Sequence, residues 1–227
     1  MQSFKAAIFD LDGVIVDTAR FHFLAWRRLA LELGFEFTEK DNERQKGVSR
    51  MASLEILLEV GGLSDLSVEN KQELATKKNE WYKEYLFEMT PEELLPGAKD
   101  FIKYLRLRGI KVALASASKN APIILDKLHI EDLFDAIVDG NSVSQAKPDP
   151  EVFLKAAEKL GIHPSECFVF EDAQAGVEGA KRAGMRVVGI GNREILHEAD
   201  MVVSGFPEIE PVVLLSNIRL KDTSIDD

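Results

Sequence analysis

The segment Ala6-Ala7-Ile8-Phe9-Asp10-Leu11-Asp12-Gly13 decides how the rest of the chain is interpreted. A short apolar run that ends in polar residues and glycine predicts a buried strand running out into a loop. Residues two apart point the same way where a strand ends, so Asp10 and Asp12 can face one pocket. In such a pair, one carboxylate can act as nucleophile or metal ligand while the other transfers protons. An ordinary strand-terminating turn uses the same residue types, so later segments must decide between the two interpretations.

From Val112 onward, short apolar runs alternate with helical patterns that end near glycines. This alternation predicts parallel strands joined by helices that cover both faces of one sheet. The expected fold class is therefore α/β, with a Rossmann-like parallel sheet as its core. With the first run included, the expected strands are 6–9, 112–115, 136–138, 167–170, 186–190 and 201–203, and the expected helices between them include 122–128, 150–160 and one that ends at Gly184.

The stretch from Thr18 to Met89 contains no convincing strand and is expected to be all-helical. A helical stripe ends at Gly34, a second helix is expected beyond Ser49, and a long helix over 68–86 has Ser67 as its N-cap. Thr90-Pro91-Glu92-Glu93 combines an N-cap, a proline at the first helical position and a capping-box glutamate, which indicates a return to the main domain. The expected domains are an α/β core formed by 1–16 and 91–227 and an inserted all-helical domain over 17–90.

The composition narrows the function classes. With 227 residues, of which 45% are hydrophobic, the chain can bury a substantial core. Its formal charge of −11 and its pI near 5.0 argue against nucleic acid and anionic membranes as partners. The single cysteine, Cys167, excludes an internal disulfide framework and is expected to be a buried strand thiol. The first strand follows within a few residues of the start and no apolar stretch could span a bilayer, so we expect a soluble cytoplasmic protein.

Three later segments carry candidate chemistry, each at or beyond the carboxyl end of an expected strand. Ser116-Ala117-Ser118-Lys119-Asn120 combines hydroxyls, backbone amides at a helix start and one lysine, which suits a phosphate, although an ordinary N-cap cluster looks similar. Lys147 precedes the rigid helix entry Pro148-Asp149-Pro150. The adjacent acids Glu171 and Asp172 could cap a helix or, together with Asp10, supply hard oxygen ligands for Mg²⁺.

Taken in order, the aspartate pair, the serine with backbone amides, the lysine and the acidic pair resemble the motif set of the haloacid dehalogenase superfamily of aspartate-nucleophile phosphotransferases. The resemblance extends from Phe4 to about Gly191 and is only loose from Gly140 to Gln145. The helical insertion is similar to the mobile cap of that superfamily. The residues in which it resembles the cap of the phosphosugar mutase branch are Thr18, His22, Trp26, Lys46, Gly47, Val48, Ser49, Arg50, Lys78 and Asn79.

The resemblance implies a role for each motif. Asp10 would attack phosphorus, and Asp12 would protonate the leaving sugar oxygen and later deprotonate the incoming hydroxyl. Mg²⁺ would be held by Asp10, the backbone carbonyl of Asp12, Asp172 and, in support, Glu171. Ser116 and Lys147 would neutralise charge on the transferring phosphate. The residues implied in binding substrate are Arg50, Ser118, Lys119 and Asn120 at the other phosphate, His22 and Lys78 in coupling closure to Asp12, and Thr18, Trp26, Lys46, Gly47, Val48, Ser49 and Ala117 around them.

The implied substrate is the β-anomer of a hexose 1-phosphate, converted to the 6-phosphate through a bisphosphate by a protein expected to be a monomer. A sugar-phosphate phosphatase is the second interpretation, because it would share Asp10, Asp12, Lys147 and Asp172. Only Lys46 to Arg50, with Lys119 and Asn120, favour transfer over hydrolysis. A non-catalytic phosphosugar-binding protein is a third possibility, against which the complete acidic set argues. A dinucleotide oxidoreductase fits poorly, since Glu194 stands where the fingerprint needs its third glycine.

Overall fold

The computed structural model describes residues 4–45 and 48–209 of the chain. The chain divides into two compact units, one formed by Met1–Asp17 with Pro91–Asp227 and the other by Thr18–Thr90. The first unit contains every strand that the described residues form, and the second contains helices.

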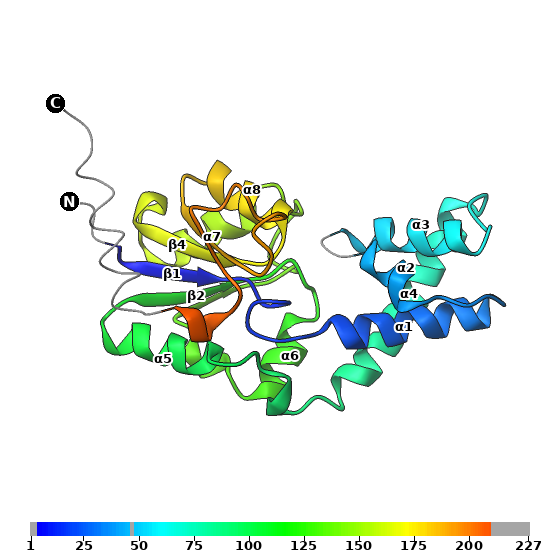
Figure 1. Ribbon diagram of the computed structural model, residues 1–227, viewed down its shortest axis with the longest axis horizontal. Coiled ribbons are helices and arrows are strands. Elements are labelled where there is room, and N and C mark those ends of the chain that lie inside the picture. The colour runs from blue at the N-terminus through cyan, green and yellow to red at the C-terminus, as the bar shows by residue number, and fades with distance from the viewer. Residues whose placement is uncertain (1–3, 46–47, 210–227) are drawn as a thin grey trace. The chain divides into compact units, whose positions relative to one another are not determined.

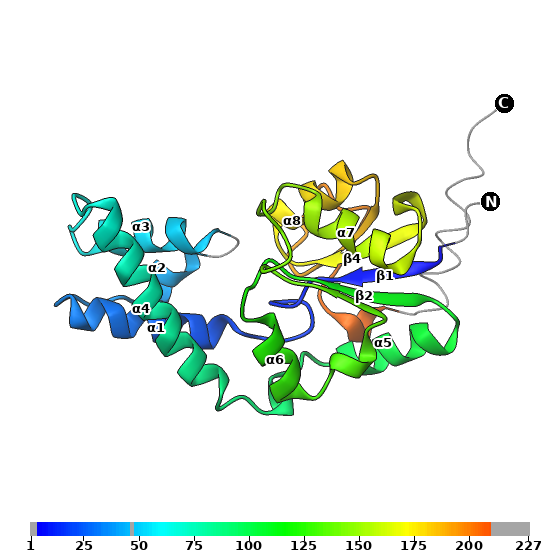
Figure 2. The same ribbon diagram turned by 180° about the vertical axis from the view of Figure 1, so that it is seen from behind.

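The first unit is built on a six-stranded parallel sheet with the order β3-β2-β1-β4-β5-β6 (Figures 1 and 2). Strand β1 lies in the middle, paired with β2 on one side and β4 on the other. The order reverses at this point, which is where open α/β sheets bind their ligands. The predicted α/β fold is confirmed, with strands β1 Ala6–Phe9, β2 Lys111–Ala115, β3 Ala136–Val138, β4 Cys167–Glu171, β5 Arg186–Ile190 and β6 Met201–Val203.

Helices cover both faces of this sheet, with α7 and α8 on one side and α5 and α6 on the other (Figure 1). Side chains alternate along β1, so Ala6 and Ile8 join the core under α7 and α8. Phe9 points to the opposite face of the sheet. Its ring stacks on that of Phe170, with 4.5 Å between ring centres, and meets the ring of Phe101 of α5 edge-on. The helices are α5 Ala98–Leu107, α6 Ala121–Leu128, α7 Glu151–Leu160 and α8 Gln174–Arg182.

The start at Thr90-Pro91 yields only a single 3₁₀ turn, Pro91–Glu93, where the sequence indicated a helix. Leu94 bridges to Val16, and the amide of Leu95 donates to the carbonyl of Ile15 (2.9 Å). These pairings pull the backbone out of the helical conformation. Pro96 and Gly97 follow, and helix α5 begins only after them.

The described residues of the second unit form four helices, of which α1 and α4 are the most extensively packed pair. Ser67 caps α4 as predicted, because its hydroxyl accepts from the amide of Asn70 (3.2 Å). Ser49, beyond which a helix was expected, caps α3 by accepting from the amide of Ala52 (3.3 Å). Thr38 forms a capping box with Asp41 at the short helix α2, which the sequence analysis did not predict. The helices are α1 Ala19–Glu32, α2 Glu39–Glu43, α3 Arg50–Val60 and α4 Val68–Leu86.

Two expectations from composition can be compared with this fold. Cys167 is the buried strand thiol that was predicted, since it lies buried in β4, and burial raises the pKa of its thiol to about 12. Among the described residues, no helix is long and apolar enough to cross a membrane.

Candidate active site

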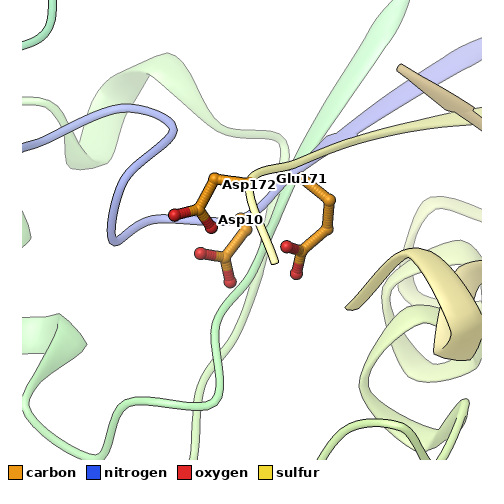
Figure 3. Close-up of side chains that lie close together, drawn as sticks. All are labelled: Asp10, Glu171 and Asp172. Atoms are coloured by element: carbon orange, nitrogen blue, oxygen red, sulfur yellow. The ribbon is translucent and has the colours of Figure 1, made fainter. Parts of the chain in front are cut away.

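Three carboxylates meet at the carboxyl edge of the sheet, at the point where the strand order reverses. Strands β1 and β4 are paired in register, and Asp10 and Glu171 are the residues that come next to Phe9 and Phe170. The amide of Asp10 donates to the carbonyl of Phe170 (3.0 Å), which holds the two strand ends together. Oxygens of Asp10, Glu171 and Asp172 all lie within 4.8 Å of one another (Figure 3). Three oxygen donors so close together form a site suited to a hard divalent cation.

Two glycines make room for these acids. Gly13 has φ +80°, and a Cβ there would overlap the carboxylate of Asp172. Gly176 lies in the first turn of α8, where a Cβ would overlap the carboxylate of Glu171. Both acids therefore lie directly against backbone. In addition, Oε2 of Glu171 accepts from the amide of Ala173 (3.0 Å), which fixes the orientation of this side chain.

Lys147 is the cation of the site. Its Nζ lies 2.5 Å from Oδ1 of Asp10 and also pairs with Oε1 of Glu171. The side chains of Lys147 and Asp10 are only 11% and 9% exposed, so this ion pair is shielded from water. Burial lowers the pKa of Lys147, but the charges of Asp10 and Glu171 outweigh that effect and raise it, so the ammonium stays protonated.

One lysine does not balance the negative charge of the cluster. Burial raises the pKa of Asp10 well above its usual value, Lys147 opposes this effect, and Glu171, Asp172 and Asp12 reinforce it. Burial, followed by the charge of Glu171, raises the pKa of Asp172 to about 7. A divalent cation between these oxygens would remove the cost of crowding the carboxylates, because it supplies the missing positive charge. Geometry and charge therefore fit the expected metal.

Asp12 lies in the tight turn that follows β1. The amide of Gly13 donates to the carbonyl of Val16 (2.8 Å), and the amide of Ile15 donates to the carbonyl of Leu11 (2.9 Å). The side chain of Asp12 lies outside the three-carboxylate cluster, but its charge contributes to the raised pKa values of Asp10 and Asp172. The Asp12 carboxylate therefore lies close enough to influence the three acids without belonging to their cluster.

The loop Ser116–Asn120 follows β2, the other neighbour of β1. The amide of Ser116 donates to the carbonyl of Val138 (3.0 Å), and Ser116 is fully buried. The hydroxyls of Ser116 and Ser118 accept from the amides of Ser118 (3.0 Å) and Asn120 (3.2 Å). The result is a compact turn in which Ala117 and Lys119 are exposed at the start of α6.

A second turn, after β3, supports this loop from behind. The amide of Gly140 donates to the carbonyl of Ser118 (3.1 Å), and Nδ2 of Asn141 donates to the carbonyl of Lys119 (3.0 Å). A Cβ on Gly140 would overlap the carbonyl oxygen of Ala117. Asp139 closes the turn by accepting from the amide of Asn141 (3.0 Å). These residues were not predicted from the sequence, in which Asp139-Gly140-Asn141 directly after a strand was the available signal.

The helical unit gathers a second set of the predicted residues. Nζ of Lys78 lies 2.9 Å from Nδ1 of His22 and 4.4 Å from the ring centre of Trp26. Tyr82, one helical turn after Lys78, stacks on His22 at 4.0 Å between ring centres and was not identified from the sequence. Burial lowers the pKa of both His22 and Lys78 well below their usual values, and nearby Arg50 adds to both shifts.

The other predicted residues of this unit differ in exposure. Thr18 is buried and directly precedes α1. Ser49 caps α3, and Arg50 is the first residue of that helix. Val48 is 43% exposed. Lys46 and Gly47 lie outside the described residues.

The chain belongs to the family of haloacid dehalogenase-like hydrolases, which it matches over residues 4–184. It is an enzyme of that family, as its relatives show. It is 47% identical to beta-phosphoglucomutase of Bacillus subtilis over 200 residues, which cover 88% of each chain. It is 37% identical to a phosphorylated carbohydrates phosphatase of Thermotoga maritima, over 82% of this chain and 85% of that one. The crystal structure of beta-phosphoglucomutase from Clostridium difficile superimposes with a TM-score of 0.84 at 40% identity, covering 96% and 99% of the two chains.

Proposed function

We propose that this enzyme interconverts β-glucose 1-phosphate and glucose 6-phosphate through a phosphorylated Asp10 and a glucose 1,6-bisphosphate intermediate. The observation that carries the proposal is the contact of 2.5 Å between Lys147 and Asp10 within the three-carboxylate cluster. It provides a fixed nucleophile, a cation and ligands for a metal in one place. The 47% identity with the Bacillus subtilis mutase, over 88% of both chains, favours a mutase among the activities of the family.

Asp10, Asp172, the backbone carbonyl of Asp12 and, in support, Glu171 would hold Mg²⁺. When bound, the ion supplies positive charge that stabilises the negative charge of phosphoryl transfer. The two glycines that lie against Asp172 and Glu171 support this assignment, because they leave room for these carboxylates directly beside the backbone.

In one half of the cycle, an oxygen of Asp10 attacks the phosphorus at position 1 of the bisphosphate and the bond from this phosphorus to the sugar oxygen breaks. Asp12 donates a proton to that oxygen, so glucose 6-phosphate leaves as an alcohol. In the other half, Asp12 takes the proton from the 6-hydroxyl of β-glucose 1-phosphate, which attacks the phosphoryl group on Asp10, and the bond from Asp10 to phosphorus breaks, so the bisphosphate forms again. Lys147 and the hydroxyl of Ser116 stabilise the equatorial oxygens in both halves, because this reaction depends mostly on positioning and electrostatics.

The exposed loop residues Ala117 and Lys119, with Ser118 and Asn120, are proposed to bind phosphate oxygens at the start of α6. Arg50 of the helical unit is proposed to bind the phosphate that is not being transferred, since its planar guanidinium can form two parallel hydrogen bonds with it. His22, Lys78, Thr18, Trp26 and the segment Lys46–Ser49 are proposed to complete the sugar site when the helical unit acts as a cap. We propose that the protein is a monomer and acts in the cytoplasm.

A phosphatase acting on the same class of substrate is the second candidate. It is favoured by the 37% identity with the Thermotoga maritima carbohydrate phosphatase. Both activities begin with the same attack by Asp10, and they differ in whether water or a sugar hydroxyl accepts the phosphoryl group.

The two candidates are separated by following β-glucose 1-phosphate with Mg²⁺ and a catalytic amount of glucose 1,6-bisphosphate. The proposal predicts that glucose 6-phosphate accumulates, that free phosphate is released only slowly, and that the α-anomer is not converted. Rapid release of phosphate without glucose 6-phosphate would identify the enzyme as a phosphatase.

A further inference from the structure

The backbone that leads to Lys147 is held by one carboxylate, that of Glu151. Oε2 of Glu151 accepts three hydrogen bonds, from the amide of Ser144 (2.8 Å), the hydroxyl of Ser144 (2.9 Å) and the amide of Gln145 (2.8 Å). These two residues come directly before Ala146 and Lys147 in the chain. The stretch between β3 and α7 is thus tied to the helix at a point just before the lysine.

Glu151 is itself well fixed. It is the first residue of α7, where a negative charge is favoured by the helix dipole, and its side chain is only 20% exposed. Its other oxygen, Oε1, pairs with Lys155 one turn later (2.6 Å), and its amide donates to Oδ1 of Asp149 (2.9 Å). Lys155, the amide of Gln145, and the hydroxyl and amide of Ser144 lower the pKa of Glu151 to about 2, so the carboxylate is ionised at neutral pH.

Helix α7 gives this anchor a rigid support. Phe153 is fully buried, and the helix packs on β1, β2 and β3. The ring of Phe153 also lies 5.0 Å from Nζ of Lys147. Helix α7 therefore carries both Glu151, which holds the loop, and Phe153, which contacts the end of the Lys147 side chain.

The backbone of Lys147 must be held in place because the side chain is long and flexible. This side chain, which is 11% exposed, must place Nζ against both Asp10 and Glu171. The position of the ammonium therefore depends on where the backbone of Lys147 lies. A shift of about 1 Å at a reacting group is enough to reduce a rate about 100-fold.

We propose that Glu151 is the positioning residue for Lys147, acting through the amides of Ser144 and Gln145 and touching neither substrate nor metal. The proposal deepens the proposed function, since it rests on the assignment of Lys147 to the transferring phosphate.

The main alternative is that Glu151 only stabilises the start of α7. Three variants separate the two roles. Glu151→Ala removes the oxygen that accepts from Ser144 and Gln145, whereas Glu151→Gln keeps one uncharged oxygen that can still accept from their amides. Glu158→Ala removes an exposed glutamate from the same helix and serves as the matched control.

The first measurement needs no substrate. Reductive methylation of the folded protein with formaldehyde and a borane, mapped by peptide mass spectrometry, reports the accessibility of the Lys147 amine. Glu151→Ala is expected to increase labelling of Lys147 several-fold, with Glu151→Gln in between and Glu158→Ala unchanged. Labelling of Lys147 in Glu151→Ala at the wild-type rate would overturn the proposal, and Glu151→Gln decides the question if Glu151→Ala does not fold.

The second measurement is a double-mutant cycle with Lys147→Ala, read by the rate of hydrolysis of a small phosphate monoester. Glu151→Ala is expected to lower kcat about 10- to 100-fold, with a smaller change in KM, and to have almost no effect once Lys147 is absent. Equal losses in both backgrounds would show a general structural role and overturn the proposal. If the wild-type enzyme never phosphorylates Asp10, the proposed function fails, while the labelling result still decides the positioning.

Discussion

Nζ of Lys147 lies 2.5 Å from Oδ1 of Asp10, although 137 positions separate the two residues in the sequence. The contact joins the carboxyl end of β1 to the loop before α7, and the same ammonium pairs with Glu171 at the end of β4. Because these groups are nearly buried, removing the lysine would leave two carboxylates without the cation that they share.

We expect Lys147→Met to lower the kcat of phosphoryl transfer about 100- to 1000-fold, the usual loss when one group that stabilises the transition state is removed. Methionine keeps most of the volume of the side chain, so the lost charge is the main change. Steady-state kinetics measure the effect, and Lys103→Met, at an exposed position of α5, is the control. An unchanged kcat in Lys147→Met would rule out its role at the phosphate.

Gly13→Ala is expected to weaken Mg²⁺ binding about 10- to 100-fold, because the added Cβ would displace the carboxylate of Asp172. The positive φ of +80° adds a loss of about 1 kcal/mol or more in stability. Gly109→Ala is the matched control, since Gly109 has φ +76° and nothing within 4 Å of the added atom. Calorimetric titration should show weaker Mg²⁺ binding for Gly13→Ala but not for Gly109→Ala. Equal Mg²⁺ affinities in the two variants would contradict displacement of the Asp172 carboxylate by the added Cβ.

Much of the core could be predicted because each strand is a short apolar run followed by polar residues. β3, β5 and β6 have the predicted bounds, and β4 extends one residue further, to Glu171. Helix α5 was missed, although Phe101, Ile102 and Leu105 form its buried face. The single turn at Pro91–Glu93 could not be predicted, since it depends on the pairing of Leu94 with Val16, 78 positions away by their numbers.

Gly140→Ala tests the support of the loop that follows β2. The added Cβ would push the carbonyl of Ala117 away, and this atom belongs to backbone that cannot rotate aside. We expect kcat/KM to fall by up to about 100-fold, with the rise in KM dominating, because the loop proposed to bind the phosphate is displaced. Gly205→Ala, whose Cβ would meet its nearest atom at 3.6 Å, should leave the kinetics unchanged. A wild-type KM in Gly140→Ala would show that the two turns are not coupled.

The pH behaviour of His22 is a further prediction. Burial, with the charges of Lys78 and Arg50, lowers its pKa well below 6.5. The folded protein therefore binds fewer protons than the unfolded chain, so stability falls as the pH drops below 6.5. Nitrogen NMR of the ring should show a neutral imidazole at pH 6 with the proton on Nε2, because Nδ1 accepts from Lys78. An imidazolium signal at that pH would contradict the buried neutral histidine.

The candidate site was predictable only where chemistry and strand ends coincide. Asp10, Glu171 and Asp172 follow apolar runs, and parallel strands bring such ends to one edge of the sheet. Gly140 and Glu151 escaped prediction because their roles depend on the approach of backbone segments that only the fold defines. Tyr82 stood four residues after Lys78 on the same helix, a spacing that could have identified it.

The most direct test is the site of phosphorylation during turnover. The enzyme is mixed with Mg²⁺ and glucose 1,6-bisphosphate, quenched rapidly in acid and mapped by mass spectrometry. We expect one phosphoryl group on Asp10 in the wild-type protein and none in Asp10→Asn, which should also be inactive. A phosphoryl group on another residue, or an Asp10→Asn protein with full activity, would contradict a mechanism in which Asp10 is the nucleophile.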